Sequence, residues 1–255
     1  MTTELPQAPF INPPPADLGR LQARARALLD VFLCSGIPTQ LLIAKVLALA
    51  GIRPLLRGGQ LNSTWVFLLA MGDTALLVLL ATLLLRANGE SPRETFLGRR
   101  RPLGEALLGI ALVGPLLLVV GIVLLATRHA WPSLHNVADN PFTGLLRSPK
   151  EAVMFACVAV LGGGVREEIQ RAFILTRFER DLGGPIVGLV FSSIAFGAGH
   201  AALQGWDAAV ATGLLGAVWG ALYFWRRSAV APMVSHAGFN SLEIIQYLVV
   251  GVRGV

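Results

Sequence analysis

Long apolar runs recur along almost the whole chain, and they constrain its fold more than any other feature. Each run is about 20 residues long, the length that a helix needs to cross the hydrocarbon core of a bilayer. Apolar residues make up 54% of the sequence and charged residues 14%, whereas soluble domains carry about 25% charged residues. The sequence therefore predicts an all-α polytopic membrane protein, a transmembrane helical bundle of about seven to eight spans. We expect spans at about 28–49, 64–85, 103–126, 152–178, 184–201, 206–225 and 230–250.

The first residues differ from the rest of the chain. Residues 1–19 are polar and rich in proline, which predicts a disordered tail. They contain no basic segment followed by an apolar core, so a signal peptide is not expected. Residues 20–255 show no internal repeat and no second soluble domain, and we expect them to form one integral membrane domain.

The net charge of +6 is explained by membrane topology and does not indicate nucleic-acid binding. Basic residues concentrate in the short loops between apolar runs, where they set orientation. With the N-terminus in the cytoplasm, about twice as many loop arginines and lysines fall on the inner side as on the outer side. We therefore expect a cytoplasmic-membrane protein with its N-terminus inside, with residues 99–101 near acidic lipids and the loop around Asn140 outside.

One apolar run contains a cluster of charges. The stretch "GVREEIQRAF" places Arg166, Glu167, Glu168 and Arg171 inside the fourth expected span. A charge near the bilayer centre costs at least about 2.5–3.5 kcal/mol, so such residues are usually paired and functional. On a helix, Arg171 can share a face with Glu167 at i+4 and with Glu168 at i+3. Taken alone, the cluster fits a salt-bridged helix contact, or a span that ends earlier, as well as it fits an active site.

Two further spans carry polar residues one helical turn apart. "FGAGH" contains Phe196 and His200, and "HAGFN" contains His236 and Asn240. One histidine on an apolar helix is more often a bonded core residue than a catalyst. Carboxylate, imidazole and amide groups from three spans, however, can together activate water. Glycines near the histidines would let these helices approach closely: Gly197, Gly199 and Gly238.

In order and spacing, these stretches resemble the signature of the CPBP family of intramembrane peptidases. This family includes type II CAAX prenyl proteases and bacteriocin-processing and abortive-infection-type proteins. Its pattern is EExxxR, then FxxxH, then HxxxN, and the resemblance covers a peptidase core at about residues 150–251. The N-terminal spans resemble the family only in being apolar. One position departs from the pattern, because Ala172 stands where the family has arginine, and Arg171 comes one place earlier.

The resemblance implies an endopeptidase that hydrolyses a peptide bond within the membrane, of the glutamic or the metallo type. Glu167 would activate the water, and Glu168 and Arg171 would orient or compensate that carboxylate. The partner would be a peptide or protein substrate, either a prenylated CAAX-type C-terminus or a bacteriocin-like or signal-type peptide.

The resemblance also assigns roles to the other motif residues. His200 and His236 would bind water and polarise the scissile carbonyl, and Asn240 would help to stabilise the oxyanion. A glutamate and two histidines could instead hold Zn²⁺ with one open position. Because the glutamate is needed as the base, we expect a site without metal or cofactor, with zinc as the alternative.

Two other functions remain open from the sequence. A catalytically inactive immunity or scaffold protein could keep the same fold and motifs. A proton-coupled transporter would also carry intramembrane glutamate, histidine and arginine, although transporters usually show a repeated half. Cleavage of a peptide library by the purified protein separates the enzyme from both.

Overall fold

The fold is known from a computed structural model that describes residues 16–137, 145 and 148–250. In this part of the chain the secondary structure is helical, which confirms the predicted all-α bundle. The helices are α1 (Ala16–Leu33), α2 (Ile37–Leu49), α3 (Ser63–Ala87), α4 (Pro92–Phe96), α5 (Pro102–Ala130), η1 (Pro132–Leu134), α6 (Pro149–Cys157), η3 (Val158–Arg166), α7 (Glu167–Asp181), α8 (Pro185–Gln204), α9 (Trp206–Arg226) and α10 (Val230–Val250).

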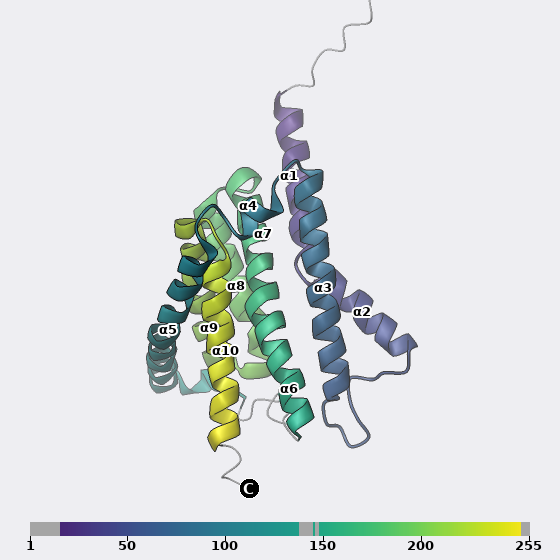
Figure 1. The fold of residues 1–255 in the computed structure, drawn as a ribbon, viewed down its shortest axis with the longest axis vertical. Helices are drawn as coiled ribbons and strands as arrows, with labels where there is room; N and C mark the ends of the chain where they lie inside the picture. The colour runs from purple at the N-terminus through teal and green to yellow at the C-terminus, as the bar shows by residue number, and fades with distance from the viewer. Residues whose placement is uncertain (1–15, 138–144, 146–147, 251–255) are drawn as a thin grey trace, which may run out of the picture.

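The long helices run alongside one another through the thickness of the bundle (Figure 1). Each of the seven expected spans coincides with a helical segment of the structure. The chain is an integral membrane protein. The polar motifs lie on three of the seven segments, α6–η3–α7, α8 and α10. Among the described residues, five helical segments are long and apolar enough to cross a membrane: 18–49, 63–87, 102–130, 185–204 and 206–226.

The first expected span is two helices instead of one. α1 begins at Ala16, so residues 16–19 of the expected tail are helical, and residues 1–15 lie outside the described residues. The chain then breaks at Gly36, whose φ of +86° favours glycine, and α2 leaves the line of α1 at an angle (Figure 1). A Cβ at Gly36 would collide with the guanidinium of Arg166. The break therefore depends on a contact with a residue far along the chain.

Buried ion pairs join the helices near the end of the bundle where α4 lies. Arg177 of α7 pairs with Glu90 and lies 3.6 Å from Asp30 of α1. Arg226 at the end of α9 pairs with Glu105 of α5 at 2.7 Å. Buried charges are tolerated when they are paired in this way. These pairs fix the relative heights of α1, α5, α7 and α9.

The structure supports a labelling test of the topology. Ser91 caps α4 just beyond the end of α3, whereas Ser148 caps α6, which is bonded to the start of α3 through Ser63 and Glu151. The 25 residues of α3 span about 37 Å at ~1.5 Å per residue, so the two serines lie at opposite ends of the bundle. The loop around Asn140 lies outside the described residues.

Cysteines introduced singly at Ser91 and Ser148 should be labelled from opposite sides of the membrane. We expect position 91 on the cytoplasmic side, because the arginines of residues 99–101 lie at the same end. Cys34 and Cys157 are replaced by alanine beforehand, and an impermeant maleimide is the label. Labelling of both positions from one side would contradict the seven-span arrangement.

Candidate active site

α6, η3 and α7 form one continuous helical segment whose middle is a π-helix. The π-helix η3 contains the sequence "LGGGV" and ends at Arg166, so that Glu167 and Glu168 begin α7. π-Helical turns are rare and occur frequently at functional sites. The glutamate pair therefore lies at the junction between a π-helical and an α-helical backbone.

Two of the three glycines in η3 make room for α10. A Cβ at Gly164 would lie 2.6 Å from the Cβ of Ala237, and a Cβ at Gly163 would collide with the amide of Asn240. Side chains at these positions would push α10 away from η3. Because α10 carries His236, the glycines allow that histidine to reach the start of α7.

The glycines expected to bring helices together do so at two positions of three. A Cβ at Gly197 would lie 2.5 Å from the carbonyl oxygen of Ala209 on α9, and a Cβ at Gly238 would lie 2.7 Å from Val113 on α5. Both are true close contacts. The prediction is wrong for Gly199, which has open space beside it.

Glu168 is the centre of a buried polar network. The residue is 2% exposed, and its carboxylate pairs with Arg171 and accepts a hydrogen bond from Nδ1 of His236 at 2.8 Å. Since a carboxylate only accepts, this bond assigns the proton of neutral His236 to Nδ1 and leaves Nε2 as an acceptor. Glu168 thus fixes both the orientation and the tautomer of His236.

Arg171 pairs with Glu168 and not with Glu167. The i, i+4 contact expected between Arg171 and Glu167 is replaced by the i, i+3 pair. The guanidinium lies 4.4 Å from the ring centroid of Phe196 and 5.6 Å from that of Trp219, so it points toward α8 and α9. Glu168 faces the same way, whereas Glu167 is displaced by about 100° around the helix.

Aromatic rings hold the two histidines in one layer. The indole of Trp219 stacks on His236, with centroids 3.9 Å apart and planes 16° apart. Its Nε1 donates a hydrogen bond to Ser235 at 2.9 Å. The ring of Phe196 lies 6.0 Å from the ring of His236 and 4.8 Å from that of His200. Phe196 therefore contacts both imidazoles.

Glu167 faces the free nitrogen of His236. Its Oε2 lies 3.9 Å from Nε2 of His236, too far for a direct hydrogen bond but a separation that one shared water can bridge. The side chain of Glu167 is 22% exposed, against 1% for Glu168. The two adjacent glutamates therefore occupy different environments on either side of one imidazole.

His200 lies at the same level as Glu167 but does not join the network directly. Counted at about 1.5 Å per residue, Glu167 lies about 21 Å from the end of α7 and His200 about 22 Å from the start of α8. Nδ1 of His200 is 2.8 Å from the carbonyl oxygen of Phe196. Among the described contacts, none joins His200 to Glu167 or His236, and Phe196 is the link between them.

Asn240 is bonded to the π-helix. Its Nδ2 donates to the carbonyl oxygen of Ala159 at 3.0 Å, so one of the two amide hydrogens connects α10 to η3. The sequence did not predict this contact, because it depends on the close approach that the glycines of η3 allow.

The donor set does not fit a metal ion as it is placed. Within the described residues, no group of three or more histidine, cysteine, aspartate and glutamate side chains is positioned to hold one. We therefore derive no chemical step through a metal.

The comparison with known families covers the segment that carries this site. Residues 149–242 match a family model described as type II CAAX prenyl endopeptidase Rce1-like. That range runs from α6 into α10 and includes all the motif residues from Glu167 to Asn240. This segment belongs to the CPBP family. No curated protein and no solved structure matches the chain.

The CPBP match indicates a membrane protease, and it leaves the N-terminal helices α1–α5 outside the matched range. One of these helices nevertheless reaches the site. Asp73 is the one acidic residue of α3 and is buried, with its Oδ2 2.7 Å from Nη2 of Arg166. The sequence analysis missed Asp73, although a single carboxylate in the middle of an apolar span is the signal that could have found it.

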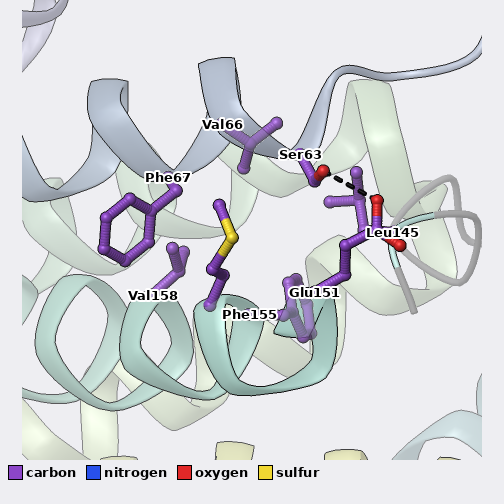
Figure 2. Close-up of a pocket in the computed structure, with 8 residues that line it drawn as sticks. Ser63, Val66, Phe67, Leu145, Glu151, Phe155 and Val158 are labelled. Atoms are coloured by element: carbon purple, nitrogen blue, oxygen red, sulfur yellow. Dashed lines mark hydrogen bonds between the residues drawn. The ribbon is translucent and has the colours of Figure 1, made fainter. Parts of the chain in front are cut away.

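A small pocket lies where α6 meets the first residue of η3, Val158 (Figure 2). It is mostly apolar, and Ser63 donates a hydrogen bond to Glu151 across it at 2.8 Å. No motif residue lines it, so it is not the candidate site. Its lining residues are Ser63, Val66, Phe67, Leu145, Glu151, Met154, Phe155 and Val158.

Proposed function

We propose that the chain is an intramembrane endopeptidase in which Glu167 activates the attacking water. The observation that carries the proposal is the division of the glutamate pair around His236. Glu168 is buried and bonded to Nδ1, whereas Glu167 faces Nε2 at 3.9 Å. A general base must be within reach of the proton that it takes, directly or through one water.

The geometry suggests the order of the chemical steps. A water between Glu167 and His236 would donate one hydrogen bond to the Glu167 carboxylate and one to Nε2 of His236. Its lone pair would then point at the scissile carbonyl carbon. As the carbon–oxygen bond forms, Glu167 takes the proton of the water. It then gives this proton to the leaving nitrogen as the carbon–nitrogen bond breaks. Glu168 keeps its hydrogen bond to Nδ1 and holds the imidazole in place throughout.

His200 and Asn240 are assigned to the carbonyl oxygen in this proposal. Because Nδ1 of His200 is engaged by the carbonyl oxygen of Phe196, Nε2 is the atom left to act, and it would donate to the developing oxyanion in the imidazolium form. Asn240 retains a second amide hydrogen beside the one given to Ala159. Donors placed where charge develops supply a large part of catalysis in such reactions.

The family match supports a proposal for the substrate class. A type II CAAX prenyl endopeptidase model favours a prenylated C-terminal peptide, and bacteriocin-like and signal-type peptides are the alternatives. We further propose that the protein lies in the cytoplasmic membrane with its N-terminus inside.

The test is cleavage by the purified protein in lipid nanodiscs. A farnesylated CAAX peptide, its unprenylated counterpart and a signal-type peptide are incubated with it, and the products are identified by mass spectrometry. We expect hydrolysis at one bond of at least one peptide. A folded protein that cleaves none of them would support the inactive scaffold, and proton-coupled uptake of a solute into proteoliposomes would support the transporter.

Metal chelation provides a separate prediction. Because Glu167 serves as the base and the donors do not converge on one point, cleavage should continue at an unchanged rate in the presence of EDTA or phenanthroline. Elemental analysis of the active protein should find no stoichiometric zinc. Loss of cleavage on chelation, with recovery when zinc is returned, would contradict this prediction and favour the metallo type.

A further inference from the structure

A second buried polar cluster adjoins Glu167, outside the three motifs. Asp73 of α3 accepts hydrogen bonds from Thr39, and from Gln40 at 3.1 Å, both on α2. Its Oδ2 is 2.7 Å from Nη2 of Arg166, the last residue of η3. Thr39, Gln40 and Arg166 together engage both oxygens of the Asp73 carboxylate.

Arg166 lies between two carboxylates. Its side chain is 9% exposed, and its Nη1 is 4.0 Å from Oε1 of Glu167, against the 2.7 Å that separates Nη2 from Asp73. Within the described part of the chain, its Nε and Nη2 make no hydrogen bond of good geometry. The absence of a Cβ at Gly36 leaves the space into which the guanidinium fits. The cation is therefore held on the side of α2 and α3 by charge and by shape.

We propose that Asp73 is a positioning residue for the peptidase reaction: it holds Arg166 away from Glu167, and so leaves the Glu167 carboxylate free to take a proton from water. This inference rests on the proposed function of Glu167. Attraction between opposite charges grows steeply as they approach in a medium of low dielectric constant. Without Asp73, Arg166 would close the gap to Glu167, form an ion pair with it and occupy its lone pairs.

No other side chain of the cluster can replace Asp73 in this role. Among the described residues, the charged or titratable groups in contact with Glu167 are Arg166 from η3 and His236 from α10, and its chain neighbour on α7 is Glu168. Glu168 is committed to Arg171 and His236. Asp73 is therefore the acceptor that keeps Arg166 from Glu167.

The chain offers a matched control for the loss of a buried ion pair. Arg226, the last residue of α9, forms an ion pair with Glu105 at 2.7 Å. Glu105 is buried, as Asp73 is. Glu105→Gln should destabilise the fold as Asp73→Asn does, but it removes nothing that lies near Glu167. A purely structural role for Asp73 predicts the same kinetic result for both variants.

The kinetic arm compares these variants in peptide cleavage. Asp73→Asn should lower kcat about 10- to 100-fold, the range expected when a catalytic group is displaced, with KM within about twofold of the wild type. Asp73→Glu, which keeps the charge, and Asp73→Asn combined with Arg166→Gln should both recover most of kcat. Equal kcat for Asp73→Asn and Glu105→Gln, or no recovery in the double variant, would overturn the proposal.

The second arm needs no catalytic activity. The coupling between positions 166 and 167 is measured from melting temperatures of Arg166→Gln, Glu167→Gln and their combination. We expect small coupling in the wild-type background and clear stabilising coupling in the Asp73→Asn background. Equal coupling in both backgrounds would overturn the inference even if the enzyme cleaves peptides. Coupling that appears as expected in a protein that cleaves nothing would keep the charge arrangement and reject the peptidase function alone.

Discussion

Glu167→Gln should lower kcat for peptide cleavage by at least about 10²-fold, because the amide cannot act as a general base. The protein should remain folded and inserted. Glutamine keeps the size of the side chain, and Glu167 is partly exposed, with its ion-pair partners among the described residues at 3.9 Å or more. Its melting temperature should therefore change little. Both quantities are measured on one preparation, by intrinsic fluorescence and by mass spectrometry of the products.

The contrast with the neighbouring residue makes this result decisive. Glu168→Gln removes a charge that Arg171 and His236 both use, so it should reduce stability and activity together. A purely structural salt-bridge cluster would lose stability in both variants and have no activity to lose. If Glu167→Gln protein cleaves at the wild-type rate, Glu167 is not the base, and Glu168 becomes the next candidate.

Arg171→Met should destabilise the fold by about 3–5 kcal/mol, the usual cost of leaving one partner of a buried ion pair uncompensated. The side chains of Arg171 and Glu168 are 4% and 1% exposed, so water cannot replace the lost partner. The measurement is the shift of the unfolding midpoint in detergent. Combining Arg171→Met with Glu168→Gln should recover much of the loss, because a neutral amide then replaces the unpaired carboxylate.

An exposed ion pair is the control for Arg171→Met. Arg99 and Glu94 are paired at 3.0 Å, but their side chains are 87% and 56% exposed. Since exposed pairs contribute little, Arg99→Met should leave the midpoint almost unchanged. Equal midpoints for Arg171→Met and the wild type would contradict an ionised, paired Glu168.

The positions of the helices could be predicted from the sequence because a membrane leaves the backbone few choices. Within lipid each backbone amide and carbonyl must be satisfied inside its own segment, so an apolar run of sufficient length forms a helix. The expected segment 206–225, for example, coincides with α9 at 206–226. The ordered motifs likewise assigned Glu168 and His236 to one expected site, and in the structure the two side chains lie 2.8 Å apart.

The remaining features depend on contacts between distant parts of the chain. The break at Gly36 is matched to the guanidinium of Arg166, and neither residue indicates the other in sequence. The π-helix depends on how closely α10 approaches Gly163 and Gly164. Arg171, which pairs with Glu168, lies against the rings of Phe196 and Trp219 on other helices. None of these contacts follows from spacing along one helix.

The ion pair between Asp73 and Arg166 also limits how the N-terminal helices could be replaced by those of another protein. Arg166 lies inside the range that matches the family model, residues 149–242, and Asp73 lies outside it. The matched segment therefore does not contain the partner of one of its own buried charges. A chimera that joins this C-terminal half to foreign N-terminal helices would leave Arg166 without its acceptor unless the new helices supply a carboxylate at the same depth. A folded chimera of this chain therefore needs N-terminal helices that supply a carboxylate to Arg166.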